Sequence, residues 1–104
     1  MTIITKDNID EIIKDGVTSI TYSAVWCGPC RQLAPVIEQL ETDFSNNDMV
    51  TITKCDLDDN QELAMEFGIR SVPTTIIFKD GEVVDTIMGV DSKTALTEKI
   101  NSFI

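Results

Sequence analysis

The chain has 104 residues, 42% of them apolar, so we expect a single domain over residues 1–104. Its net charge of −10, from 8 basic and 18 acidic residues, disfavours direct binding to nucleic acid or to anionic membranes. No apolar run approaches the roughly 18 residues of a membrane span, and the N-terminus does not resemble a secretory signal. The absence of histidine removes the usual general base of hydrolases and the commonest neutral metal ligand.

The first half of the chain alternates between helical and strand periodicity. After a short extended piece, the pattern predicts a short helix that Asp7 or a neighbour caps and that Gly16 ends. A strand over Val17–Val25 follows, and after two cysteines a helix runs to about Phe44, with a kink expected at Pro35. The apolar positions that define the two helices are Ile9, Ile12, Ile13, Leu33, Val36, Ile37, Leu40 and Phe44.

The second half of the chain continues the alternation and adds one hairpin. Asn60 is expected to cap a helix that stops at Gly68, and Asp80-Gly81 is a strong signal for a two-residue turn. The sequence therefore predicts an α/β fold, with a mixed sheet of four to five strands flanked by about four helices on both faces. The remaining elements are expected over Met49–Cys55, Thr74–Lys79 and Glu82–Met88 as strands, and from Asp91 or Ser92 onward as a helix burying Leu96, Ile100 and Phe103.

Cys27 and Cys30 stand where the second strand gives way to a helix. Cys27 is expected at the helix N-terminus, where unpaired N–H groups and the helix dipole favour the nucleophilic thiolate. Cys30 follows one turn later, within reach of a disulfide, and we expect it to be the more buried of the two. Gly28 allows a substrate backbone to approach, and Pro29 fixes φ in the first turn. This arrangement predicts thiol–disulfide exchange, with Cys27 attacking and Cys30 resolving.

Two plainer interpretations of the cysteine pair are a structural disulfide and half of a zinc site. Structural zinc takes about four ligands in a tetrahedral arrangement. Beyond Cys27 and Cys30 only Cys55 remains as a further thiol, and the chain has no histidine to supply a fourth ligand. We therefore expect no metal, and the lack of a G-x-G-x-x-G fingerprint predicts that the chain binds no nucleotide cofactor. An odd cysteine count in a chain with a normal core points to a reducing compartment.

These features resemble the thioredoxin family over nearly the whole chain. The Gly-Pro pair between the cysteines resembles the pair found in thioredoxins rather than that of glutaredoxins or secreted disulfide isomerases. This resemblance favours a reductant over an oxidant. The segments that carry the resemblance are Trp26-Cys27-Gly28-Pro29-Cys30, Pro35, Lys54, Phe67-Gly68-Ile69-Arg70-Ser71-Val72-Pro73-Thr74, Phe78-Lys79-Asp80-Gly81 and Gly89.

The resemblance implies a thioredoxin fold and a monomeric cytoplasmic electron carrier that reduces disulfides in protein substrates. An NADPH-dependent thioredoxin reductase would recharge it, so NADPH would act only indirectly. The resemblance also implies a cis peptide bond at Val72-Pro73, facing the cysteines, which leaves the Val72 backbone free to pair with an extended substrate. The residues implied to line the substrate groove are Trp26, Gly28, Val72, Pro73, Gly89 and Val90.

One departure from the family concerns the second cysteine. Thioredoxins usually carry a buried aspartate six residues before the first cysteine, where this chain has Thr21, and Ser23 replaces a usual aromatic residue. The aspartate is thought to accept the proton of the second cysteine, and Lys54 is its usual partner. We expect the Lys54 ammonium to reach water or to approach the sulfurs, and Cys30 to lose its proton to water, to Lys54 or to the leaving thiolate.

Other polar and sulfur-bearing residues fit structural roles. Cys55 is expected to pack as a small apolar side chain, with a regulatory thiol as the alternative. Asp56, Asp58 and Asp59 precede a helix and are expected to favour its positive end, with calcium binding as the alternative.

Two rival functions remain open. One is a binding module, a thioredoxin fold acting as subunit or processivity partner of a larger assembly, with redox activity incidental. The other is an oxidase or isomerase, which the reduction potential of the pair would distinguish.

Overall fold

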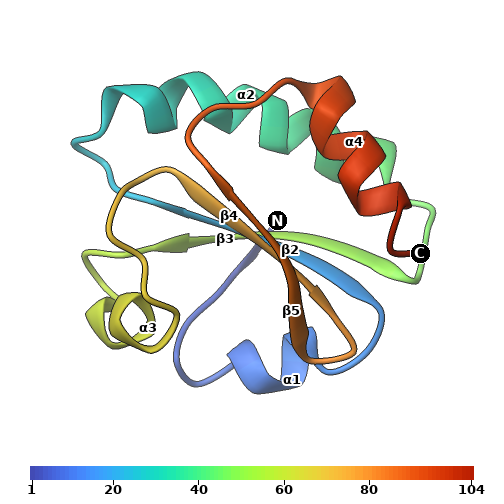
Figure 1. The fold of residues 1–104 in the computed structure, drawn as a ribbon, viewed down its shortest axis with the longest axis horizontal. Helices are drawn as coiled ribbons and strands as arrows, with labels where there is room; N and C mark the ends of the chain where they lie inside the picture. The colour runs from blue at the N-terminus through green and yellow to red at the C-terminus, as the bar shows by residue number, and fades with distance from the viewer.

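A computed structural model describes all 104 residues, and Figure 1 shows a sheet with helices on both faces. Helices α2 and α4 cover one face, and α1 and α3 cover the other. In chain order the elements are β1 (Thr2–Ile3), α1 (Ile9–Ile13), β2 (Val17–Ser23), α2 (Gly28–Asp43), β3 (Val50–Asp56), α3 (Gln61–Glu66), β4 (Thr74–Lys79), β5 (Glu82–Met88) and α4 (Lys93–Asn101).

The five strands form one mixed sheet in the order β1-β3-β2-β4-β5. Strands β1, β3 and β2 are parallel, whereas β4 and β5 are each antiparallel to their neighbours. The first six of the seven residues of β2 are buried, because β2 is central and both of its faces are covered by helices. The expected fold class is confirmed, and helix α2, which begins with the segment after Cys27, follows the central strand β2 in the chain.

Each face of the sheet has its own apolar core. The face under α2 and α4 buries ten residues: Val17, Leu33, Ile37, Leu40, Val50, Ile52, Ile77, Ile87, Leu96 and Ile100. The opposite face buries nine: Ile4, Ile9, Ile13, Ile20, Tyr22, Cys55, Leu63, Ile76 and Phe78. The alternation of side chains along the central strands feeds both cores, and this fixes the register of the sheet.

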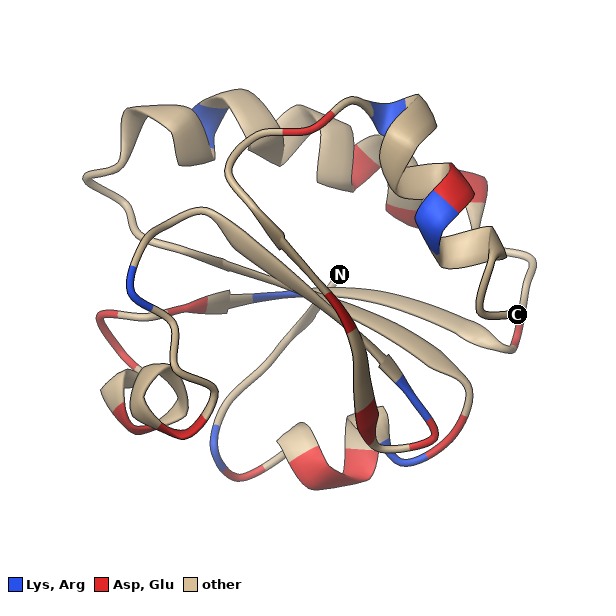
Figure 2. Cartoon of the chain, in the orientation of Figure 1, with Lys and Arg blue, Asp and Glu red and all other residues tan.

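The hairpin between β4 and β5 forms as expected, with Asp80 and Gly81 at φ values of 50° and 89°. Both values are positive, as a tight turn of two residues requires. Strand β5 is one edge of the sheet, and acidic residues interrupt it (Figure 2). These are Glu82 and Asp85, which flank the exposed side chains of Val83 and Val84.

Several expected boundaries differ from the structure. Strand β2 ends at Ser23 rather than at Val25, because the chain turns there and Cys27 N–H donates to the Ala24 carbonyl at 3.1 Å. Strand β3 begins at Val50 and runs to Asp56, one residue later at each end than expected. Helix α2 is assigned continuously through Pro35, whose kink stays a prediction.

The helix caps are also only partly as expected. Asn60 precedes α3, but its side-chain amide donates to the Asp56 carbonyl at 2.9 Å instead of capping the helix. At α1 the N-cap position belongs to Asn8, whose side chain accepts from Thr5 N–H and makes no cap bond. The cap of α4 is confirmed, since Ser92 Oγ accepts from Ala95 N–H at 3.1 Å. None of the helices combines the length and apolarity that crossing a membrane requires.

Candidate active site

Cys27 is the N-cap residue of α2, with an extended backbone at φ −90° and ψ 117°. Its Sγ accepts a hydrogen bond from the Cys30 N–H at 3.2 Å, which is one of the unpaired donors of the first turn. Pro29 lies in that first turn, where its missing N–H costs no helical hydrogen bond. The start of α2 therefore directs a backbone donor and the positive end of the helix dipole at the Cys27 sulfur.

The loop before β4 closes over the same sulfur. The Val72-Pro73 bond is cis, as expected, and the Cys27 thiol donates to the Val72 carbonyl at 3.6 Å. Val72 is partly buried and packs against a small cluster of Ala24, Cys27 and Cys30. The sequence separates Cys27 from Val72 by 45 positions, and the sheet brings them together.

The two thiols are buried almost equally. Cys27 is 5% exposed and Cys30 is 7% exposed, so the expectation that Cys30 is the more buried was wrong. The reason is the Val72 loop, which covers Cys27 from outside its own helix. Burial, together with the hydrogen-bonding contact with Cys27, raises the pKa of Cys30 to about 11. Cys30 therefore holds its proton near neutral pH until a base accepts it.

An exposed apolar surface surrounds the cysteines. Val25 and Trp26 are 73% and 67% exposed, and the Trp26 indole N–H donates to an Asp58 carboxylate oxygen at 3.0 Å. Trp26 and Val72 also border a hollow of about 170 Å³ whose other lining residues are Ala24, Leu57, Ile69, Arg70 and Ser71. Gly28 is exposed, and a methyl group placed on it would meet no atom within 4 Å. Space for a substrate backbone is therefore present beside the cysteines.

The segment after β5 reaches the same end of the sheet. Gly89, at φ 83°, donates its N–H to the Pro73 carbonyl at 2.8 Å, and the next residue, Val90, is exposed. The structure thus connects Cys27 to Val72, Pro73 and Gly89 through successive contacts.

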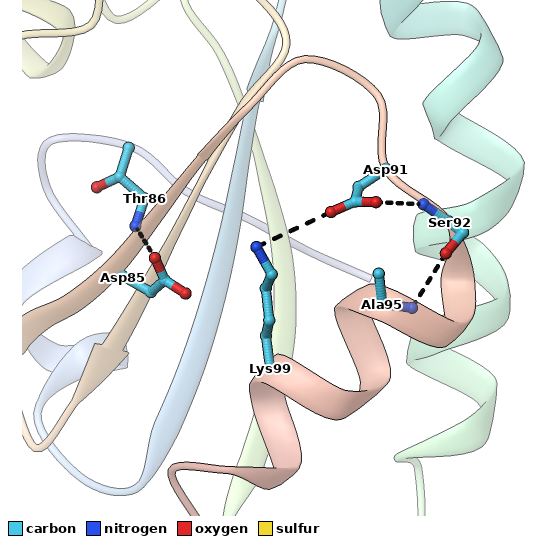
Figure 3. Close-up of polar contacts among 6 residues, drawn as sticks. All are labelled: Asp85, Thr86, Asp91, Ser92, Ala95 and Lys99. Atoms are coloured by element: carbon cyan, nitrogen blue, oxygen red, sulfur yellow. Dashed lines mark hydrogen bonds and ion pairs between the residues drawn. The ribbon is translucent and has the colours of Figure 1, made fainter.

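Figure 3 shows how the segment after Val90 is held at the start of α4. Asp91 accepts from the Ser92 N–H at 2.9 Å and pairs with Lys99 at 3.9 Å, while Ser92 caps the helix through Ala95. These contacts fix the place where the chain passes from the cysteine end of the sheet into α4.

A cavity of about 50 Å³ borders Cys30 and shares no lining residue with the hollow beside Trp26. Thr21 and Ser23 of β2 line it together with Lys54 of β3, and Met1, Ala34, Ile37 and Glu38 complete the wall. The Lys54 side chain is exposed and belongs to no ion pair within 4 Å, which agrees with an ammonium that reaches water. Cys30 and Lys54 therefore face a common cavity.

The remaining cysteine, Cys55, belongs to a different buried cluster from Cys27 and Cys30. Cys55 is completely buried in the core that also contains Tyr22 and Phe78, as expected for a packing role. Burial, with a smaller contribution from the negative charge of Asp56, raises the pKa of its thiol to about 11. No group of three or more His, Cys, Asp or Glu side chains is arranged to hold a metal ion.

Sequence reasoning missed three contacts at the site. Asp58 was assigned to a helix end, but it holds the Trp26 indole. Arg31 donates to the Val25 carbonyl at 3.0 Å, and Glu38 reaches the Cys30 cavity from two turns along α2. Helical spacing alone could have indicated that Glu38 and Cys30 share a face of α2, eight residues apart.

Comparison with known proteins agrees with this geometry. The family model for thioredoxin matches residues 1–102. The chain belongs to the thioredoxin family. Curated thioredoxins from Staphylococcus saprophyticus and Bacillus subtilis are 41% and 43% identical, over 97% and 86% of this chain and 95% and 85% of their own lengths. It is therefore a protein-disulfide oxidoreductase of the thioredoxin type.

Solved structures lead to the same family. A mutant thioredoxin from Halobacterium salinarum superposes with a TM-score of 0.86 at 34% identity, over 97% of this chain and 88% of that one. Thioredoxin from Plasmodium falciparum gives a TM-score of 0.87 at 29% identity over the whole of both chains.

Proposed function

We propose that Cys27 is the nucleophile and Cys30 the resolving thiol of the family reaction. Cys27 thiolate attacks one sulfur of a target disulfide, forms a mixed disulfide and releases the other target sulfur as a thiolate. Cys30 then loses its proton and attacks Cys27, which breaks the bond to the target and leaves an internal disulfide. The target gains two electrons and the cysteine pair loses two. Gly28 and Pro29 shape the turn that holds the pair.

The observation that carries this proposal is the hydrogen bond from Cys30 N–H to the Cys27 sulfur at the N-terminus of a 16-residue helix. A backbone donor and the helix dipole both favour negative charge at that sulfur. The exchange needs an attacking sulfur, and the geometry provides a backbone donor and a helix N-terminus beside that of Cys27.

The groove residues and Lys54 have supporting roles in this proposal. Trp26, Val72, Pro73, Gly89 and Val90 receive an extended substrate segment, with the Val72 backbone pairing to it as an added strand would. The ammonium of Lys54, across the cavity from Cys30, stabilises the Cys30 thiolate as it forms.

The surroundings of the reaction follow from the family and the composition. The chain acts as a single-domain monomer in a reducing compartment, the cytoplasm, where three free thiols persist. Its substrates are disulfide-containing proteins, and a thioredoxin reductase recharges it as an electron carrier. NADPH serves that reductase, and this chain uses no bound cofactor.

Insulin disulfide reduction tests the proposal, first with dithiothreitol and then with a thioredoxin reductase and NADPH. The parent protein should accelerate both reactions over the uncatalysed rate. Cys27→Ser should abolish the acceleration, and Cys30→Ser should accumulate a mixed disulfide with the target. A Cys55→Ser variant is the matched control and should retain the parent rate. No acceleration by the parent in either format would refute the residue roles.

The exposed side chains of Val25, Trp26 and Met88 could also serve a binding module. The Cys27→Ser variant separates the two functions, because a binding role survives loss of the thiol. Complementation of a strain that lacks its own thioredoxins, by the parent and by Cys27→Ser, is the deciding comparison.

A further inference from the structure

Transfer of the Cys30 proton is an unsolved step in the reaction, and this inference rests on the proposed function. Cys30 is 7% exposed, and burial raises its pKa to about 11. Thr21, which lines the space behind it, carries a hydroxyl that does not titrate near neutral pH. The thiol therefore needs another proton acceptor that it can reach from inside the protein.

The cavity behind Cys30 provides a route to such an acceptor. Its volume of about 50 Å³ exceeds the roughly 10–15 Å³ that one water molecule requires. Thr21 and Ser23 line it, and Ser23 carries a hydroxyl that can hydrogen-bond such water. Glu38 and Lys54, which also line the cavity, are exposed, so the route extends from the buried thiol to solvent.

Only one of the charged groups around the cavity is a free proton acceptor. The Met1 ammonium is 3.3 Å from Glu41, and Lys93, which lies near Glu38, is 3.0 Å from Asp43. Lys54 is a donor when it is charged, and Cys27 is the sulfur under attack. The Glu38 carboxylate belongs to no ion pair within 4 Å. Its oxygens are therefore available to water in the cavity.

We propose that Glu38 is the proton acceptor of the resolving step and takes the Cys30 proton through water in this cavity. The Cys30 S–H bond breaks, its proton passes to water, and the water gives a proton to the Glu38 carboxylate. The Cys30 thiolate attacks Cys27, the Cys30–Cys27 disulfide forms, and the bond from Cys27 to the target sulfur breaks. The target leaves as a thiolate, and Glu38 returns its proton to solvent.

Stopped-flow reaction of the reduced protein with one equivalent of dithiobis(nitrobenzoate) separates the two steps. Attack by Cys27 releases the first thionitrobenzoate, and attack by Cys30 on the mixed disulfide releases the second. In Glu38→Gln the second phase should be about tenfold slower at neutral pH, below the usual contribution of a directly placed base. Its rate should also rise more steeply with pH, because hydroxide replaces the lost acceptor, while the first phase should stay within about twofold.

Two matched variants control this experiment. Glu41→Gln removes the same charge from the next turn of α2 but from a side chain that does not line the cavity, and it should keep the parent second phase. Glu38→Asp keeps the carboxylate and should recover most of the rate. Ser23→Val should slow the second phase as well, because its added methyl groups fill the space that water needs.

The outcomes separate the two proposals. If the parent shows both phases and Glu38→Gln matches it in rate and pH profile, the role of Glu38 is wrong and the exchange mechanism stands. An equal slowing by Glu41→Gln would also overturn it, since that result shows a general charge effect on α2. If the parent neither releases the second thionitrobenzoate nor reduces insulin, the exchange mechanism itself is wrong.

Discussion

The side-chain oxygens of Thr21 and Thr75 lie 3.0 Å apart in the interior, where β2 and β4 run side by side. Both residues are buried, at 5% and 2% exposure, and one hydroxyl donates a hydrogen bond to the other. A neutral hydrogen-bonded pair therefore occupies the region where the resemblance to the family implies a buried aspartate.

Thr21→Val should lower the free energy of unfolding by about 1–3 kcal/mol, because it leaves the buried Thr75 hydroxyl without a partner. Urea denaturation of the reduced protein measures this loss. The double variant Thr21→Val/Thr75→Val should recover much of the stability, since both partners are then apolar and of similar shape. Additive losses in the double variant would show that the hydroxyl pair does not contribute as a unit.

Thr21→Asp should accelerate resolution by Cys30 several-fold at neutral pH, because it places a carboxylate on the same cavity wall. The rate of the second thionitrobenzoate phase against pH measures the effect. The uncharged Thr21→Asn is the control and should not accelerate the step. A rate and pH profile equal to those of the parent would exclude the idea that threonine limits proton transfer here.

Local sequence patterns predicted most of the fold, because most of its helices, strands and turns are determined by residues close together in the sequence. The periods of α2 and α4 and the turn at Asp80-Gly81 all have local causes. The end of β2 was misplaced because Ala24 and Val25 continue a strand-like composition. The strand nevertheless ends at Ser23, because the chain turns after it and begins helix α2 at Gly28.

Stability of the reduced protein should fall as pH rises from about 9 to 11, partly because of Cys55. The thiol titrates near 9 when unfolded, whereas burial raises its pKa to about 11 in the fold. Between these two pKa values the unfolded chain binds fewer protons than the folded protein. The free energy of unfolding therefore falls as pH rises, by up to about 2–3 kcal/mol. Urea denaturation between pH 7 and pH 11 measures the loss, and Cys55→Ala should reduce it. An unchanged pH slope in Cys55→Ala would contradict the assignment to Cys55.

Asp58→Ala should weaken substrate binding more than it slows chemistry. The carboxylate holds the Trp26 indole beside the cysteines, and its removal frees an exposed side chain to adopt several rotamers. We expect KM for insulin to rise about two- to fivefold with kcat little changed, and the tryptophan fluorescence to shift. Asp59→Ala removes the same charge one residue away and should leave KM unchanged; an equal rise there would assign the effect to charge alone.

The candidate site could be predicted only where the chain itself brings residues together. Cys27 and Cys30 are one helical turn apart, so spacing placed them correctly at the start of α2. The near-equal burial of the two thiols could not be predicted, because it depends on Val72 from a distant loop. The cavity shared by Cys30 and Lys54 depends on the packing of α2 against β3, which no local pattern specifies.

The acidic residues of β5 have a consequence for handling this protein at low pH. An edge strand has unpaired backbone N–H and C=O groups to which a strand of another copy could hydrogen-bond. The exposed apolar side chains of Val83 and Val84 favour such pairing. The carboxylates of Glu82 and Asp85 oppose it by mutual repulsion between copies. Near the sequence pI of about 4.1 the net charge of the chain vanishes, so repulsion between copies is lost. Storage at that pH should therefore promote aggregation through this edge of the sheet.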